Sequence, residues 1–175
     1  SINGPGTLDL TSLTANFPAG FSNAALGLNL NNVIVNGPGT LTNAPTQTLT
    51  LISSTINAPL SNQGLLLVHG SNTVNGVLTT VAGAGSVIRG EGINATGTGT
   101  LTVLNGFTNT AAIELTNANV NQAAQLTVTN GTLANTGTIS ALVGATGGAR
   151  TLAAQLDNQA TGTLNVSQAL TLNRG

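Results

Sequence analysis

The chain has 175 residues, and only 4% of them are charged, against roughly a quarter in typical soluble domains. Three basic residues and a net charge of −1 remove the electrostatic basis for nucleic-acid binding, which depends on clustered Lys and Arg. No apolar run approaches the ~18 residues of a membrane span, and without Cys there are neither disulfides nor thiolate metal sites.

Short segments in which apolar residues occupy every second position recur along the chain. This alternation predicts strands with one buried and one solvated face, and the solvated positions are mostly Thr, which is β-branched and polar. Gly, Pro and Asn separate the segments and favour turns. The clearest strand candidates, in chain order, are residues 7–10, 26–30, 48–51, 100–103, 125–128 and 169–172.

The tripeptide Gly-Thr-Leu recurs at intervals of 33, 60, 32 and 31 residues. A fixed period in a chain of short strands is typical of a solenoid, whose coils stack on their neighbours. With coils of about 31 residues, the leucines of the tripeptides would form one interior column. They are Leu8, Leu41, Leu101, Leu133 and Leu164.

A second pattern competes with the first: an apolar residue, any residue, then Asn, at intervals of 19, 47, 26 and 23 residues. It fits coils of about 23 residues, so the coil length is open between about 23 and about 31. Because an Asn amide can hydrogen-bond to the equivalent amide one coil away, this pattern predicts a ladder through Asn109, Asn135 and Asn158.

Short strands, frequent corners and no helical periodicity predict an all-β fold with no helices of note. We expect a parallel β-helix (β-solenoid) of about six to eight coils. It would form a single domain over residues 1–175 and be part of a longer chain or a fibre subunit. Antiparallel hairpins are the alternative, because Asn75-Gly76 and Asn105-Gly106 also suit two-residue hairpin turns.

Two segments, GTLANTGTIS at residues 131–140 and LDNQATGTLNV at residues 156–166, resemble the repeats of large bacterial surface proteins. The resemblance is to filamentous-haemagglutinin-like adhesins and autotransporter passengers, and it covers most of the chain. It implies a right-handed β-helix, secretion, and a stalk or fibre at the cell surface. It carries over no catalytic motif.

We therefore expect a non-enzymatic, extracellular structural module: a stalk or fibre segment of a bacterial surface protein, with end-to-end stacking of coils on itself. Surface glycans are a second candidate partner. The alternatives on the same fold are a carbohydrate-binding adhesin and a polysaccharide-degrading enzyme. We expect no cofactor and assign no catalytic, cofactor-binding or metal-binding residue.

Three residues in the middle of the chain have ionisable side chains that could form a polar site: His69, Arg89 and Glu91. They would serve as acid, base and anion clamp in polysaccharide cleavage. The simpler interpretation is an Arg89–Glu91 ion pair on a loop, with His69 at a corner. Glycosidases normally need paired carboxylates, and no two of the four acidic residues are neighbours in the sequence. Those residues are Asp9, Glu91, Glu114 and Asp157.

The remaining motifs have simpler explanations. The Gly-rich run at residues 97–100 lacks the Lys of a phosphate-binding loop and predicts a corner. The turns lack the regular Asp residues of calcium-binding repeats. Repeated Thr-x-Thr suggests ice binding as a function, but the spacing of the motif is irregular. A solvated strand face explains the same Thr residues. Phe17 and Phe21 predict either a mutual contact or a loop folded over the core.

Overall fold

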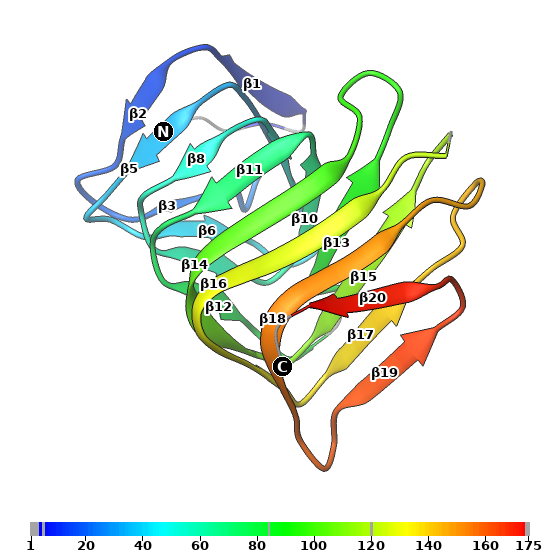
Figure 1. Cartoon of the computed structure of the whole chain (residues 1–175). Coiled ribbons are helices and arrows are strands. Elements are labelled where there is room, and N and C mark those ends of the chain that lie inside the picture. The colour runs from blue at the N-terminus through cyan, green and yellow to red at the C-terminus, as the bar shows by residue number, and fades with distance from the viewer. Residues whose placement is uncertain (1–3, 5, 84, 120, 174–175) are drawn as a thin grey trace.

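In a computed structural model, which describes residue 4 and residues 6–83, 85–119 and 121–173, the chain winds into a right-handed parallel β-helix of about eight coils (Figure 1). The described residues contain no helix. Each of the first four coils passes in turn through three sheets, which we call A, B and C, and the later coils pass through sheets A and B. All pairs of named strands are parallel, so the solenoid prediction is confirmed and the hairpin alternative is wrong.

The sheets are formed by equivalent strands of successive coils. Sheet A contains β1 (Thr7–Thr11), β4 (Gly27–Asn31), β7 (Thr48–Ile52), β10 (Leu65–His69), β13 (Val87–Gly92), β15 (Ala112–Asn117), β17 (Thr138–Ala141) and β19 (Thr163–Val166). Sheet B contains β2 (Thr14–Asn16), β5 (Ile34–Asn36), β8 (Thr55–Ile56), β11 (Ser71–Val74), β14 (Gly99–Asn109), β16 (Ala124–Asn135), β18 (Arg150–Asn158) and β20 (Leu170–Asn173). Sheet C contains β3 (Phe21–Ser22), β6 (Leu41–Asn43), β9 (Leu60–Asn62) and β12 (Leu78–Thr80).

From the fifth coil onward, the strands of the B and C sides merge. The long strands β14, β16 and β18 bend around the corner, with a register irregularity between Asn105 and Phe107 where β14 turns. Their last residues continue the C side of the solenoid, since Asn109 pairs with Asn135 and Asn135 with Asn158. The cross-section therefore has three sides in the first seven coils.

Successive coils differ in length, and this resolves the two competing repeats. Paired residues lie 17 positions apart between Thr48 and Leu65 and 26 apart between Ala112 and Thr138. The pattern ending in Asn follows the coils, whereas the period of about 31 residues is wrong. The expected column of tripeptide leucines does not exist, because these residues lie on three different sides of the solenoid. Four of the five tripeptides lie at the start of a strand and the one at residues 131–133 lies inside β16, so the tripeptide does not mark one side.

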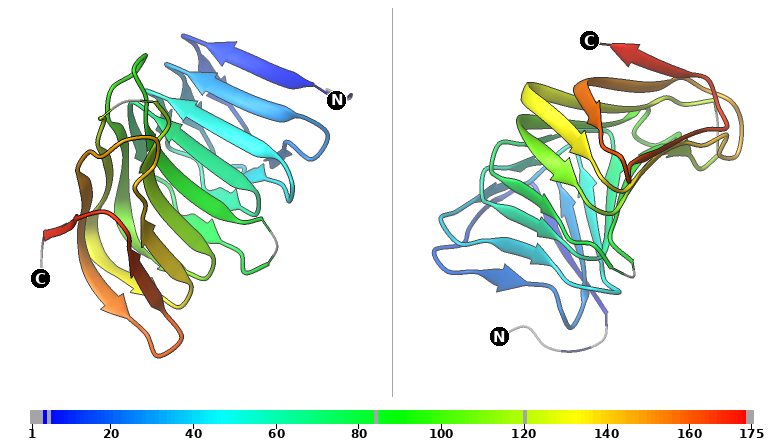
Figure 2. Two further views of the ribbon diagram at one scale, coloured as in Figure 1. Left: turned by 90° about the vertical axis from the view of Figure 1, so that its right-hand side faces the viewer. Right: turned by 90° about the horizontal axis from the view of Figure 1, so that it is seen from below.

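The interior columns instead join residues of one sheet. One column of sheet A is aliphatic in every coil, and its six central members are at most 2% exposed. Burying each such side chain contributes roughly 1.5–3 kcal/mol. The coils stack on one another (Figure 2), and their buried side chains form one continuous core. The column contains Leu8, Leu28, Leu49, Leu66, Ile88, Ile113, Ile139 and Leu164.

The predicted asparagine ladder is confirmed. Asn109 Nδ2 donates to Asn135 Oδ1 at 2.8 Å, and Asn135 Nδ2 donates to Asn158 Oδ1 at 2.7 Å. Asn109 and Asn135 are fully buried. Backbone carbonyls also accept from these amides, because Asn135 Nδ2 lies 3.3 Å from the oxygen of Thr163. The ladder thus satisfies buried polar groups at the corner between sides C and A.

The same corner column begins in the first coils. Asn23 Nδ2 donates to Asn43 Oδ1 at 2.9 Å, and Asn43 Nδ2 donates to Asn62 Oδ1 at 2.7 Å. In the fourth coil Thr80 replaces Asn, and its Oγ1 accepts from the backbone N–H of Thr110 at 2.9 Å. A hydroxyl therefore takes the place of the amide between the two asparagine runs, and it bonds to the backbone of Thr108 and Thr110 instead of to an asparagine side chain.

The aromatic pair of the first coil makes the mutual contact, which is one of its two interpretations. The rings of Phe17 and Phe21 stack with centroids 5.0 Å apart and planes 7° apart. Both rings also pack against the core from the end of the solenoid. The mutual contact is confirmed, and Phe21 is the register partner of the buried Leu41 in sheet C.

Candidate functional site

Four ionisable side chains converge on the outward face of sheet A, and we call them the ionic face. They are His69 at the end of β10, Arg89 and Glu91 in β13, and Glu114 in β15. In β13 the buried residues Ile88 and Gly90 alternate with these side chains, which places Arg89 and Glu91 outward. The four represent half of the eight ionisable side chains in the sequence.

The ionic face consists of two pairs that bridge neighbouring coils. His69 Nε2 lies 3.0 Å from Glu91 Oε2, and Arg89 Nε donates to Glu114 Oε2 at 2.7 Å. The side chains are 13%, 18%, 35% and 22% exposed for His69, Glu91, Arg89 and Glu114. The expected Arg89–Glu91 pair on a loop is wrong, because both residues lie in one strand and each pairs with a different coil.

The structure brings together two of the four carboxylates. Arg89 is the register partner of Glu114, so Glu91 and Glu114 occupy diagonal positions on adjacent strands. Asp9 and Asp157 stay apart from them, in β1 and β18. Asn29 Nδ2 donates to Asp9 Oδ1 at 2.6 Å, and Gln159 Nε2 donates to Asp157 Oδ2. Glycoside hydrolysis uses one protonated and one ionised carboxyl group, whereas both glutamates of the ionic face are paired with a basic side chain.

The corner between sheets A and B becomes longer beside the ionic face. In the first four coils it is a link of one or two residues, the first of which has a left-handed backbone with φ between 50° and 68°. In the fifth to seventh coils, loops of residues 93–98, 118–123 and 142–149 replace that link, with residue 120 outside the description. The three loops project from one corner (Figure 1). The four corner residues are Ser12, Asn32, Ser53 and Gly70.

Buried polar side chains order these loops. Arg150, at the start of β18, is fully buried and donates to the carbonyl oxygens of Leu142 at 2.9 Å and Val143 at 3.0 Å. It also donates to the carbonyl of Gln122 at 3.2 Å, in the preceding loop. Loss of hydration on burial lowers the pKa of the Arg150 guanidinium below its ordinary value. Sequence reasoning missed Arg150, because its partners are backbone carbonyls.

The loop of residues 93–98 lies next to the ionic face. It contains the predicted corner at residues 97–100, where Gly97 has φ 76° and β14 then begins. Thr96 packs on the preceding corner, since a Cβ added to Gly70 would lie 3.5 Å from Thr96 Cβ. Thr96 Oγ1 is buried and has no hydrogen-bond partner in the described part of the chain.

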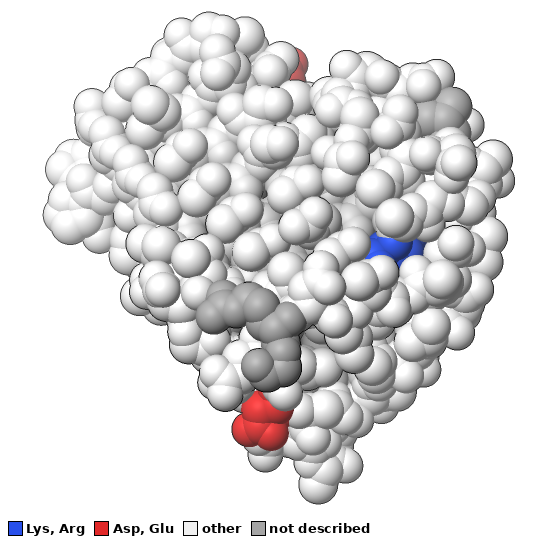
Figure 3. Space-filling model, in the orientation of Figure 1, with Lys and Arg blue, Asp and Glu red and all other residues white. Residues whose placement is uncertain are grey.

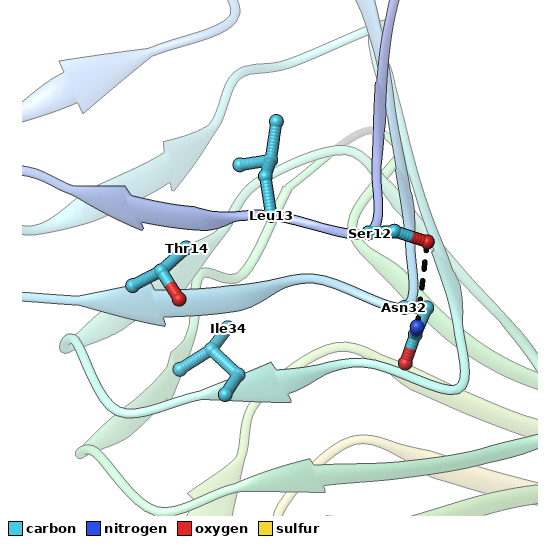
Figure 4. Close-up of a pocket in the computed structure, with 5 residues that line it drawn as sticks. All are labelled: Ser12, Leu13, Thr14, Asn32 and Ile34. Atoms are coloured by element: carbon cyan, nitrogen blue, oxygen red, sulfur yellow. Dashed lines mark hydrogen bonds between the residues drawn. The ribbon is translucent and has the colours of Figure 1, made fainter.

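A shallow depression on the outer surface of the first two coils has fewer reactive groups than the ionic face. Its lining mixes hydroxyl, amide and aliphatic groups and contains no ionisable side chain (Figure 4). Leu13 and Ile34 are 40% and 45% exposed, and Asn32 Nδ2 donates to Ser12 Oγ at 3.4 Å. The lining residues are Ser12, Leu13, Thr14, Asn32 and Ile34.

The Thr-x-Thr segments are distributed over different sides. Thr48 and Thr50 belong to sheet A, Thr42 to sheet C, and Thr100 and Thr102 to sheet B. On sheet B, Gln125 and Ala153 interrupt the ranks of hydroxyl groups. The surface visible in Figure 3 is nearly free of charged side chains.

No protein-family model matches this chain, and neither a curated protein nor a solved structure is significantly similar to it. Among the described residues, no three His, Asp or Glu side chains gather as metal ligands would. None of the described elements is a helix of the length and apolarity that crossing a membrane requires.

Proposed function

We propose that the chain is a non-catalytic structural segment of a bacterial surface protein, outside the cell, in which stacked β-coils form a stalk or fibre. The observation that carries this proposal is the open state of the terminal coils. Val166 and Leu172, which face inward in the last coil, are both 56% exposed. Their register partners one coil earlier, Ala141 and Leu152, are buried.

The first coil is open in the same way at the other end. Leu8 and Leu10 are only partly buried, whereas Leu28 and Leu30 above them are at most 1% exposed. The edges of β1 and β19 also lack a strand partner among the described residues. Unpaired edges and uncovered apolar side chains favour the addition of further strands. We propose that further coils, from the same chain or a second copy, cover both ends.

The hydrogen bonds between coils support a mechanical role. Parallel ladders run through all eight coils of sheets A and B, and the asparagine columns add side-chain hydrogen bonds between coils. The coils rise about 4.8 Å each, so every added coil lengthens the rod without a new core. The low charge and the resemblance of residues 131–140 to surface repeats support an extracellular location.

Light scattering after size exclusion, over a range of concentrations, tests end-to-end stacking. We expect particles larger than the 17.2 kDa monomer whose mass grows with concentration, and rods in electron micrographs. Val166→Asp should stop this growth, because it places a carboxylate in the stacked junction. The matched control is Leu104→Asp, which adds the same charge at a lateral position that is 37% exposed.

A monomer at every concentration would contradict self-stacking. Equal growth in Val166→Asp and in the wild-type chain would also contradict it, because the contact would then lie away from the terminal coil. Loss of assembly in both variants would show that added negative charge, not the junction, controls association.

A further inference from the structure

We propose that the ionic face is a binding site for a neutral oligosaccharide, a function beyond the structural role. The first argument is the concentration of charge. The two pairs lie at the surface with side chains 13–35% exposed, and surface ion pairs contribute at most about 1 kcal/mol to stability. Solubility is better served by charges spread over the surface. Neither reason explains why half of the ionisable groups lie on three neighbouring strands of one face.

The second argument is the free hydrogen-bonding capacity of the paired groups. Arg89 uses Nε for Glu114, and its two terminal nitrogens have no partner among the described residues. Glu91 and Glu114 each use one carboxylate oxygen in a pair, which leaves the other oxygen to accept. Adjacent hydroxyl groups of a sugar both accept and donate, so they can bind a guanidinium and a carboxylate side by side.

The third argument concerns the charge and shape of the ligand. One guanidinium and one imidazole face two carboxylates, so the face has no net positive charge, which disfavours phosphate, sulfate and uronate groups. The aromatic side chains lie elsewhere, with Phe17 and Phe21 in the first coil and Phe107 buried. A site without aromatic rings does not suit bases or apolar peptides. A neutral chain of hydroxyl groups fits what remains.

The fourth argument is the ordered corner beside the site. The loop of residues 93–98 forms a step at the edge of sheet A, and Asn94 N donates to Asn119 Oδ1 of the next loop at 3.1 Å. Further along, the buried Arg150 guanidinium holds its loop without a carboxylate partner among the described residues. Burying a cation in this way is costly, which is consistent with loops whose shape matters for binding.

Amide chemical shifts of the isotopically labelled whole chain test the site. We would titrate cellohexaose, maltohexaose and xylohexaose, with hexagalacturonate as the anionic comparison. The proposal predicts that at least one neutral hexasaccharide shifts the signals of β10, β13, β15 and residues 93–98. Arg89→Gln should weaken this binding at least tenfold. Arg89→Lys, which keeps the charge but loses the forked donor, should weaken it too.

The matched control is Asp9→Asn, which removes a charge from the same outward column four coils away. It should leave binding unchanged. The proposal is overturned if no neutral hexasaccharide shifts these signals, or if Arg89→Gln binds like the wild-type chain while its spectrum remains folded. Tighter binding of hexagalacturonate than of the neutral sugars would also overturn it.

Discussion

The asparagine ladder makes a quantitative prediction at Asn135, which is fully buried. Asn135→Leu keeps the size of the side chain but removes three hydrogen bonds, those with Asn109, Asn158 and the Thr163 carbonyl. A buried partner left unsatisfied costs about 1–3 kcal/mol. Asn109 Nδ2 keeps two carbonyl contacts at 3.3 Å, with Ala111 and Thr138, so its loss is partial.

We therefore expect Asn135→Leu to lower the free energy of unfolding by about 3 kcal/mol. In a domain of this size, 1 kcal/mol shifts Tm by about 2–4 °C, so the expected drop is about 10 °C. Thermal unfolding followed by circular dichroism measures it. The drop should come with unchanged secondary structure at 20–25 °C, because the backbone ladders of β16 remain.

The matched control is Asn57→Leu, in a second ladder on the outer surface. Asn57 Nδ2 donates to Asn36 Oδ1 at 2.8 Å and Asn57 Oδ1 accepts from Asn75 at 2.8 Å, but Asn57 is exposed. Water can replace those hydrogen bonds, so the Tm of Asn57→Leu should fall by no more than about 3 °C. Equal drops in both variants would refute the argument from burial, and an unchanged Tm for Asn135→Leu would refute the ladder itself.

Three further predictions concern packing, the loops and the ionic face. Gly137→Ala should lower Tm strongly, because the added Cβ would lie 2.1 Å from the Ala111 carbonyl oxygen. Its control, Gly20→Ala, should be tolerated, because there the nearest atom, the Thr40 carbonyl oxygen, is 3.6 Å from the added Cβ. Equal Tm values for the two variants would contradict the tight contact between coils. Arg150→Met should speed hydrogen exchange across residues 142–149, since their carbonyls lose their donor, and unchanged exchange would remove Arg150 from its ordering role. A double-mutant cycle in urea with His69→Gln and Glu91→Gln should give a coupling energy below about 1 kcal/mol; a larger value would show that the pair exists for stability.

The fold could be predicted from local patterns because a solenoid repeats its interactions. Alternating Leu and Thr identified strands, and the apolar-x-Asn pattern located Asn109, Asn135 and Asn158 on one column. The Gly-Thr-Leu repeat was misleading, because Leu8, Leu41 and Leu101 lie in strands of three different sheets. Unequal coil lengths make any single period approximate, so the repeat established stacking but not its register.

The ionic face could not be assembled from the sequence for the same reason. His69 and Glu91 are 22 positions apart and Arg89 and Glu114 are 25 apart, which places them on adjacent coils only once the coil length is known. The pairing of Arg89 with Glu91 seemed natural in the sequence because they are near neighbours. In a strand, however, residues two apart point the same way and their partners lie on the next strand. Arg150 gave no signal, because backbone carbonyls accept from it.

The most direct test of in-register stacking is a set of distances between spin labels along one outward column. The column runs from Asp9 through Asn29 and Thr50 to Asn165, with one residue in each coil. Because the chain lacks Cys, pairs of introduced cysteines can be labelled selectively. Measured from position 165, the distances to positions 9, 29 and 50 should be about 34, 29 and 24 Å, falling by about 4.8 Å per coil. Distances that do not fall by one constant step per coil would contradict the solenoid and everything derived from it.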